Sequence, residues 1–324
     1  MLRPLWCNAF KSSWLTIPGV TLGSCSLWRL NTVFNTDSHF HIGAFHLTQG
    51  KPCQDYCASA GGIDGITYAI VSDGCSTGGH TDVGSRILVL STATALKQHW
   101  SVHRTTQGEA IPKQISVQQK IVMGTAQQTL GLSQQDMLAT CIYVYLSEDG
   151  GFVNIQGDGV VAYKYRDGAL SLCRYEWDCN TPFYPAYAND HYAAFIGAHG
   201  GDVSVEKLNV ECWEFAADKW HACPSRAFTL SQGIEGIVSP ISLEDLRNLE
   251  FIAIFSDGVT QVSRVNWKKA AQQLLAFKST EGAFVKRRMN RFLKDSQIRG
   301  SGPLDDLACA VIHVTPPQET NDDH

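Results

Sequence analysis

Four short apolar segments in this chain lead directly into or out of an aspartate, which places a carboxylate at the end of each expected strand. The segments and their acidic turns are residues 66–72 with Asp73-Gly74, residues 152–156 with Gly157-Asp158-Gly159, residues 251–256 with Asp257-Gly258, and Asp305-Asp306 with residues 307–313. Rigid strands that converge from two sheets can hold several oxygen ligands around one point, as hard cations such as Mg²⁺ and Mn²⁺ require. The pattern predicts an oxygen-ligand metal site.

The same dipeptides have a simpler interpretation, because Asp-Gly is a common hairpin turn. Asp167-Gly168 fits that interpretation, since it joins two adjacent short runs that resemble strands. The segments before Asp73, Asp158 and Asp257 are largely apolar on both faces, the middle one least clearly. This indicates buried central strands whose ends open into a site rather than into surface hairpins.

Length and composition fit a globular protein of one domain, or at most two, with a large core: of 324 residues, 44% are hydrophobic and 18% are charged. No apolar run approaches the roughly 18 residues of a membrane span, and Pro4, Lys11 and several serines interrupt the N-terminal segment before a signal peptide could form. We therefore expect a cytoplasmic protein that does not bind membranes.

The net charge of −5 has the wrong sign for nucleic-acid binding. One local basic cluster is interpreted as a solvated helix face, and it consists of Lys286, Arg287, Arg288, Arg291 and Lys294. The 11 cysteines lack the spacing of a disulfide framework, which favours reduced thiols. Cys53 and Cys57, with Cys75 and His80 nearby, are a weak zinc pattern, because no second closely spaced pair completes it.

Helical periodicity is expected in residues 81–98, 112–130, 265–278 and 283–294. The predicted apolar faces include Leu90 in the first helix and Val117, Ile121 and Leu130 in the second. The order is strands, two helices, a long run of strands, two helices and a last strand. This order predicts an α+β fold in which helices cover the sheets.

Five motifs, in this order, resemble the metal-dependent protein phosphatase family (PP2C or PPM), and they look most like its bacterial branch. The motifs are Gln54-Asp55, Ser72-Asp73-Gly74 before a glycine-rich turn and a helix, Gly157-Asp158-Gly159, Ser256-Asp257-Gly258-Val259, and Asp305-Asp306-Leu307-Ala308 before a terminal strand. Each motif is weak by itself, but five in order over residues 45–314 make a strong signal.

The resemblance implies a β-sandwich of two antiparallel sheets flanked by helices, in α-β-β-α layers. It divides the chain into an N-terminal extension (1–40) that can supply an extra strand, a phosphatase domain (41–316) and a polar tail (317–324). A flap-like variable segment is expected at 172–238. Its many aromatic residues form either a small satellite core or a protein-docking surface, and they are Tyr175, Trp177, Phe183, Tyr184, Tyr187, Trp213 and Trp220.

The resemblance also implies a cleft that holds two Mg²⁺ or Mn²⁺ ions. The implied ligands are Asp73 bridging both ions, the Gly74 carbonyl on one ion, and Asp257 and Asp305 on the other, with Asp73, Asp257 and Asp305 as the catalytic set. Asp55 would act in the outer shell through water, and Asp158 lies where some family members hold a third, weaker ion. Two ions roughly 3.5–4 Å apart acidify a bridging water and neutralise phosphate, so no protein nucleophile is needed.

Two departures from the family pattern affect the substrate side of the site. Many eukaryotic members have a histidine directly after the first Asp-Gly, but this chain has Cys75, which leaves His80 or a metal-bound water as candidates for the general acid. The arginine that usually precedes the Gln-Asp motif is also missing. Lys51 and His46 are the candidates to bind phosphate in its place.

We therefore expect a monomeric cytoplasmic hydrolase that removes phosphate from phosphoserine and phosphothreonine in a phosphoprotein, in signalling opposite a cognate Ser/Thr kinase. Cysteine-phosphatase chemistry is not favoured, because Cys53, Cys57 and Cys75 lie outside any C-x₅-R loop. One alternative is a metal-dependent hydrolase of a non-protein phosphate ester, which would keep every ligand. A pseudophosphatase that serves as an interaction module is the other, and the retained aspartates speak against it.

Overall fold

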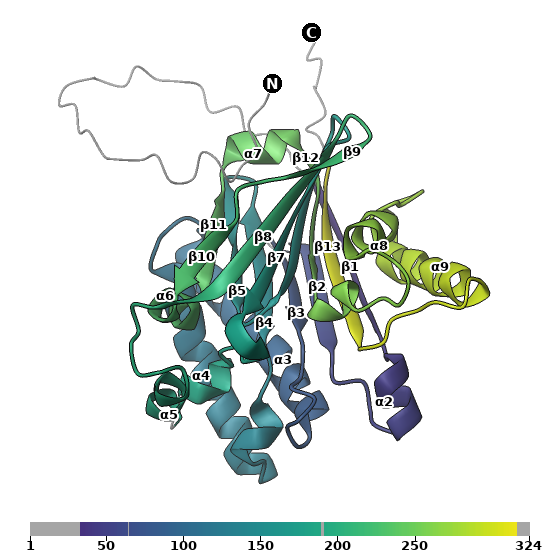
Figure 1. Ribbon diagram of the computed structural model, residues 1–324. Coiled ribbons are helices and arrows are strands. Elements are labelled where there is room, and N and C mark those ends of the chain that lie inside the picture. The colour runs from purple at the N-terminus through teal and green to yellow at the C-terminus, as the bar shows by residue number, and fades with distance from the viewer. Residues whose placement is uncertain (1–32, 64, 189–190, 316–324) are drawn as a thin grey trace, which may run out of the picture.

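Two antiparallel sheets pack face to face in the computed structural model, which describes residues 33–63, 65–188 and 191–315 (Figure 1). The larger sheet contains, in spatial order, β1 (Val33–His41), β13 (Leu307–Thr315), β12 (Leu249–Phe255), β6 (Gly159–Tyr165), β7 (Leu170–Trp177), β8 (Glu206–Ala216) and β10 (Arg226–Thr229), with β9 (Lys219–Ala222) paired to β8. The smaller sheet contains β11 (Ile237–Ile241), β5 (Gly150–Gln156), β4 (Cys141–Ser147), β3 (Ile66–Ser72) and β2 (Tyr56–Ile63).

Helices cover the outer face of each sheet. The smaller sheet is covered by α3 (Thr81–His103) and α4 (Ile111–Leu130), and the larger sheet by α8 (Trp267–Leu274) and α9 (Phe284–Ile298). The remaining short helices are α2 (Ala44–Gln49), α5 (Tyr192–Ala198), α6 (Leu230–Glu235) and α7 (Leu243–Asn248), with 3₁₀ turns η1 (Gln134–Met137), η2 (Asp178–Asn180), η3 (Pro185–Ala188) and η4 (Asp257–Thr260). These α-β-β-α layers confirm the predicted fold class.

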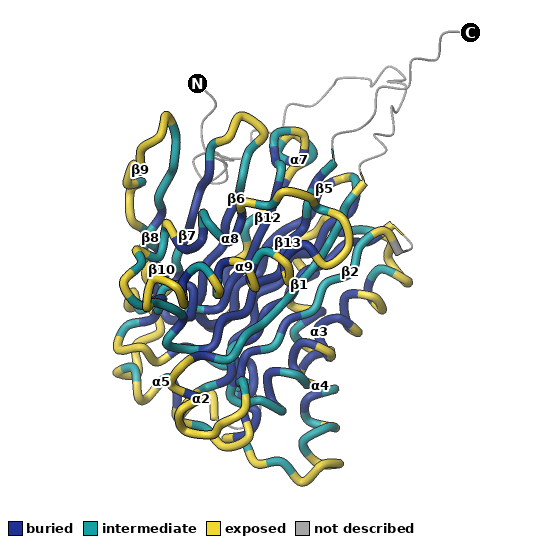
Figure 2. Tube along the Cα trace, turned by 90° about the vertical axis from the view of Figure 1, so that its right-hand side faces the viewer, coloured by how far each residue is buried: buried dark blue, intermediate teal, exposed yellow. Residues whose placement is uncertain are grey.

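The central strands are buried on both faces, as their apolar sequences predicted. Every residue of β3, β4 and β5 is buried, and Figure 2 shows the middle of both sheets as buried chain. Val71, Val144, Ile254 and Ile312 meet in the layer between the sheets. Because each such side chain contributes about 1.5–3 kcal/mol on burial, this layer fixes the relative position of the two sheets.

The faces that α3 and α4 bury differ from the predicted ones. Leu90 on α3 and Val117 and Ile121 on α4 are each 56% exposed. The α4 helix lies against α3, and its buried stripe includes Gln119, whose amide donates a hydrogen bond to the Thr92 hydroxyl at 2.7 Å. The buried face of α4 also carries Ile115 and Met123, so the helix has apolar side chains on two faces, and the polar Gln119 hides the buried one in the sequence.

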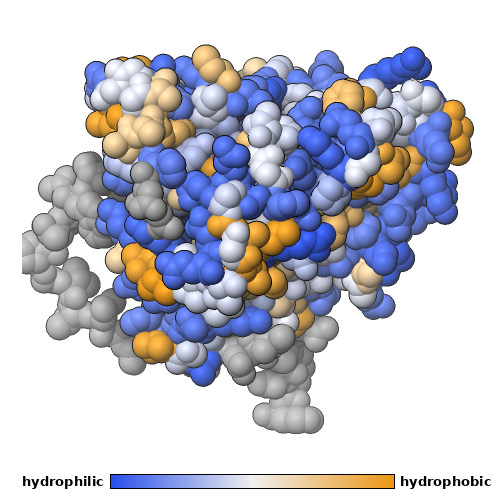
Figure 3. All heavy atoms as spheres, turned by 90° about the horizontal axis from the view of Figure 1, so that it is seen from below, coloured by the Kyte–Doolittle hydropathy of each residue, from blue (hydrophilic) through white to orange (hydrophobic). Residues whose placement is uncertain are grey.

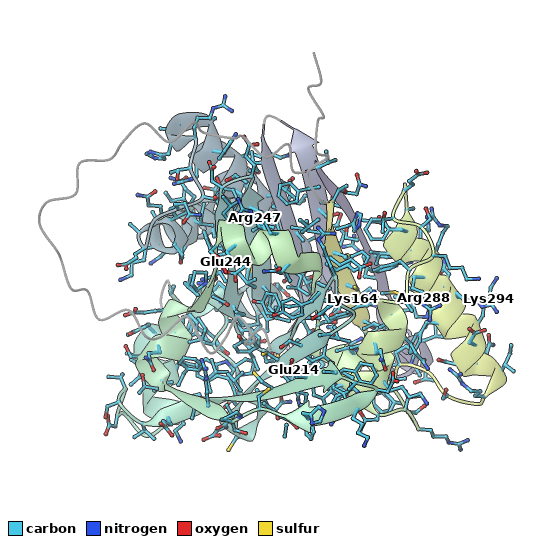
Figure 4. The ribbon with its side chains drawn as sticks, turned by 90° about the horizontal axis from the view of Figure 1, so that it is seen from above. Lys164, Glu214, Glu244, Arg247, Arg288 and Lys294 are labelled. Atoms are coloured by element: carbon cyan, nitrogen blue, oxygen red, sulfur yellow. The ribbon has the colours of Figure 1, made fainter. Side chains whose placement is uncertain are left out.

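The basic cluster lies on α9, as predicted. Phe284, Val285, Met289 and Phe292 bury one side of this helix against the larger sheet. Its basic side chains are exposed apart from Arg288, which reaches the Gln273 carbonyl of α8. Figure 4 shows Lys294 on the outer side of α9, so the interpretation as a solvated helix face is confirmed for most of the cluster.

Other predictions have mixed outcomes. The nine cysteines in the described ranges are not joined by disulfides, and their reduced state stays a prediction. None of the described helices has both the length and the apolar character needed to cross a bilayer.

The predicted boundary after residue 40 falls inside β1, which pairs with β13 at the edge of the larger sheet. The tail 317–324 and residues 1–32 lie outside the described residues, so the division into segments stays a prediction.

Candidate metal centre

The four predicted aspartates meet at one end of the sandwich, the lower end in Figure 1, where α2 and α5 lie. β3 and β5 run in the same direction because each is antiparallel to β4 between them, so Asp73 and Asp158 emerge at the same end. Because β12 and β13 are antiparallel, Asp257 at the end of one strand meets Asp305 before the start of the other. All four side chains line a cavity of about 220 Å³. Seen from this end, the molecular surface is mostly hydrophilic, with separate apolar patches (Figure 3).

The glycines after Asp73 and Asp257 allow segments to approach each other closely. A Cβ atom at Gly258 would overlap the Asp306 carbonyl, and one at Gly74 would lie 2.8 Å from the Thr81 carbonyl oxygen. Gly168 instead has a φ of +90° and open space around it, and its N–H donates to the Tyr165 carbonyl at 3.0 Å. Gly168 is therefore a hairpin glycine, and the predicted distinction between Asp167 and the cavity aspartates holds in their positions.

Hydrogen bonds from neighbouring strands fix the turns that carry the smaller sheet's aspartates. The Thr140 hydroxyl accepts from the Asp73 N–H at 3.2 Å, and the Thr140 N–H donates to the Asp73 carbonyl at 2.8 Å. The Trp177 indole donates to the Gly157 carbonyl at 2.9 Å. The turn at Asp73 is thus joined to the segment before β4, and the turn at Asp158 to β7.

Asp305 and Asp306 are adjacent but occupy different environments. The side chain of Asp305 lines the cavity and is 29% exposed, whereas that of Asp306 is 2% exposed. The Asp306 carboxylate accepts from the Gly43 N–H at 2.7 Å and the Gln54 N–H at 2.6 Å, and it lies 2.8 Å from His46 Nδ1. Asp306 therefore binds two distant backbone segments to the turn that presents Asp305.

His46 is accordingly not where the substrate-binding prediction placed it. Its side chain is buried against Asp306, 4.0 Å from the nearest Asp305 oxygen, and it does not line the cavity. Lys51 lies nearer to the opening, where its ammonium donates to the Ser76 carbonyl at 3.3 Å. His80 is exposed just before α3, outside the cavity lining.

Asp55 lies behind the cavity rather than in its lining. It is 1% exposed, and its Oδ2 accepts from the Ser256 hydroxyl at 2.6 Å. Its Oδ1 has no hydrogen-bond partner among the described residues. The carboxyl groups of Asp55 and Asp257 are each within hydrogen-bonding reach of Asp73, which makes Asp73 the central member of the group.

Burial and mutual repulsion disfavour the charged form of the carboxyl groups in this site. Burial raises the pKa of Asp73 and Asp55 well above their usual values, and the negative charges of neighbouring aspartates add to the effect. Burial, with the charge of Asp257, raises the pKa of Asp158 to about 8. Several buried carboxylates can be ionised together only if a cation compensates them. The cavity aspartates are hard oxygen donors, and Asp55 Oδ1 behind them is buried without a hydrogen-bond partner among the described residues. Both features fit Mg²⁺ or Mn²⁺.

The sequence did not identify several residues of the site. The Gln261 amide donates to Asp257 at 2.9 Å and to Asp305 at 3.3 Å, and so links the two carboxylates from the larger sheet. Gln261 directly follows η4, four residues after Asp257. This spacing is a signal in the sequence that could have identified it as a residue of the site. Thr140, Asn180 and Tyr184 also line the cavity, and no spacing rule singles them out.

The aromatic flap-like segment forms a packed cluster. Trp177 is buried in the layer between the sheets, and Phe195 packs edge-on against it at 5.8 Å. Phe183 and Tyr187 complete the cluster around Phe195, with ring centroids 5.2 and 5.4 Å away. Trp177, Phe183 and Tyr187 thus pack as part of the core between the sheets rather than as a separate satellite core, whereas Tyr184 lines the cavity.

Comparison with known proteins identifies a related family. Residues 42–178 match the family model described as protein phosphatase 2C. No curated protein matches the sequence. The chain is similar to the S. agalactiae serine/threonine phosphatase, with 18% identity, coverage of 87% of this chain and 100% of that one, and a TM-score of 0.47.

Two further solved structures are similar. The catalytic domain of the phosphatase PstP, in complex with two manganese ions, has 15% identity, coverage of 88% and 100%, and a TM-score of 0.47. Stp1 from Staphylococcus aureus has 12% identity, coverage of 93% and 100%, and a TM-score of 0.47. These TM-scores are too low for the structures to support an assignment.

The close approach at Gly258 leads to a stability prediction. We expect Gly258→Ala to lower the free energy of unfolding by about 1–3 kcal/mol, because its methyl group would push the η4 turn away from Asp306. Gly124→Ala is the matched control: it lies within α4 with open space around it, so it should raise stability by about 0.5–1 kcal/mol. Urea unfolding measures both. Equal stabilities for Gly258→Ala and the wild type would contradict the packing described here.

Proposed function

We propose that this protein is a phosphatase of the protein phosphatase 2C type, which hydrolyses phosphoserine and phosphothreonine in a phosphoprotein with two Mg²⁺ or Mn²⁺ ions. One observation carries the proposal. The cavity is lined by four carboxylates, and none of its described lining residues is cationic. A phosphate group would be repelled from such a cavity unless bound cations reversed its charge.

The positions of the carboxylates support specific roles. Asp73 is central to the group, which suits it to bridge two ions, with the Gly74 carbonyl on one of them. Asp257 and Asp305 would share the other ion, because Gln261 already holds their carboxylates together. A third, weaker ion would be held near Asp158, and Asp55 would act behind the ligands through water.

When bound, the ions would lower the pKa of a water molecule and neutralise charge on the phosphate. The chain's own residues supply the geometry. Gln261 orients two ligand carboxylates, and Thr140 fixes the backbone at Asp73. In the reaction, a water oxygen bonds to phosphorus as the ester P–O bond breaks, and the serine or threonine alcohol leaves.

A protein substrate implies an opposing Ser/Thr kinase and a role in signalling. The free cysteines of the described residues are consistent with the reducing cytoplasm, where we place this activity. We propose that the enzyme acts as a monomer. Hydrolysis of phosphothreonine peptides, compared with nucleotides and small phosphate esters, separates this proposal from a phosphatase of small molecules.

Activity should depend on a hard divalent cation. We expect EDTA to abolish hydrolysis of p-nitrophenyl phosphate and of a phosphothreonine peptide, and Mn²⁺ to restore both, because the cavity offers oxygen ligands. Mn²⁺ should also raise the melting temperature, since it binds only the folded chain. Full activity in chelator, or restoration by Zn²⁺ alone, would exclude the proposed metal centre.

Ligand aspartates should differ from turn aspartates. Asp73→Asn and Asp257→Asn are each expected to lower kcat/KM at least ~10²-fold, since each weakens an ion needed to activate water. Asp167→Asn is the matched control, because Asp167 lies in the β6–β7 hairpin, where its Oδ1 accepts only from the Ala169 N–H at 2.9 Å. It should retain nearly full activity. Similar losses in all three variants would contradict the assigned roles.

The thiol beside the metal-binding turn should not act as a nucleophile. Cys75 lines the cavity, but with water as nucleophile we expect Cys75→Ser to lose less than ~10-fold in rate. No phosphocysteine should be trapped by acid quenching with ³²P-labelled substrate. A loss as large as that of Asp73→Asn, together with label on the denatured wild-type protein, would support covalent catalysis instead.

A further inference from the structure

Tyr184 is the aromatic residue of the flap-like segment that reaches the aspartate cavity. It lines this cavity together with Asp73, Asp158 and Cys75. Cys75 directly follows the Asp73-Gly74 turn. Residues far apart in the sequence thus place a phenol hydroxyl beside the proposed metal ligands.

The surrounding structure holds Tyr184 in place. Its ring lies edge-on to Tyr187 at 5.4 Å, and its carbonyl accepts from the Tyr187 N–H at 2.9 Å. Tyr187 packs in turn against Phe183 and Phe195 of the aromatic cluster. The Gln134 amide donates to the Ala186 carbonyl at 2.7 Å and attaches the segment to η1. These contacts hold the ring and the backbone of Tyr184, as a positioned donor requires.

Tyr184 stands where the cavity opens. A second hollow of about 520 Å³ adjoins the cavity, and both are lined by Cys75, Thr77, Asn180, Pro182 and Tyr184. A polypeptide that carries a phosphoryl group into the cavity must leave it on the open side. With the polypeptide in the second hollow, the serine or threonine oxygen that joins it to the phosphoryl group would lie on the side of Tyr184.

The hydroxyl is suited to donate a hydrogen bond. A tyrosine hydroxyl carries its proton near neutral pH, because its ordinary pKa is about 10. Near a developing negative charge, a fixed donor stabilises the transition state more than the ground state.

We propose that the Tyr184 hydroxyl donates a hydrogen bond to the serine or threonine oxygen of the substrate as its bond to phosphorus breaks. This inference rests on the proposed phosphatase function. The electron pair of the ester P–O bond goes to that oxygen, a water oxygen bonds to phosphorus, and a proton from the water ends on the leaving alcohol. Tyr184 keeps its own proton throughout. It supplies a donor in a chain that has Cys75 in place of the histidine found in many relatives.

The test compares substrates whose leaving groups differ. An alkoxide needs stabilisation, whereas p-nitrophenolate is a stable leaving group and needs little. We expect Tyr184→Phe to lose about 10–100-fold in kcat for a phosphothreonine peptide, with KM unchanged, and less than about 3-fold for p-nitrophenyl phosphate. Retained activity on p-nitrophenyl phosphate also shows that the variant is folded.

Two controls accompany the variant. Tyr192→Phe removes a phenol hydroxyl from the same stretch, on exposed α5, where it lines neither hollow, and both activities should stay at the wild-type level. The rise in melting temperature with Mn²⁺ should be the same in Tyr184→Phe as in the wild type, because Tyr184 is not a proposed metal ligand.

The outcomes separate this inference from the proposed function. Equal losses on both substrates, a loss confined to KM, or no loss at all would each overturn the role of Tyr184 and leave the phosphatase function intact. If the wild type hydrolysed neither substrate with Mn²⁺, the proposed function would fail and the inference with it.

Discussion

The cost of gathering carboxylates in one buried cavity is the constraint on which the rest of this structure depends. Asp73, Asp158, Asp257 and Asp305 come from two sheets, and their mutual repulsion adds to the loss of hydration. Such a group persists only where the fold forces it together and a cation compensates it. The buried strands supply the force, because their side chains are packed on both faces, between the two sheets and under the covering helices.

Adjacent residues of the site divide its tasks between chemistry and support. Asp305 faces the cavity, while Asp306 turns inward and binds the backbone at Gly43 and Gln54. Gly258 also serves as support, because its lack of a side chain lets the η4 turn contact the Asp306 carbonyl. The positions of the cavity carboxylates are therefore set partly by contacts of neighbouring residues, which is how a site acquires precise geometry.

The flap-like segment combines two functions in one stretch. Its rings bury one another around Phe195, and this packing extends through Trp177 to the turn that carries Asp158. The same packing holds Tyr184 at the opening of the cavity. Stability and the shape of the cavity are thus coupled here, since a ring removed from the cluster would also move a residue of the cavity lining.

Local sequence patterns determined the strands, the layers and the identity of the cavity aspartates. A strand that is apolar on both faces must be buried, and an aspartate directly after it lies at the end of the buried strand. These predictions needed no knowledge of which distant residues the aspartates contact. Contacts with residues distant in the sequence decided which helix faces are buried and where the other polar side chains lie. The buried face of α4 depends on the bond between Gln119 and Thr92, and His46 is buried because Asp306 accepts from it. Gln261 and Tyr184 lie at the site because the tertiary structure brings their distant segments together there.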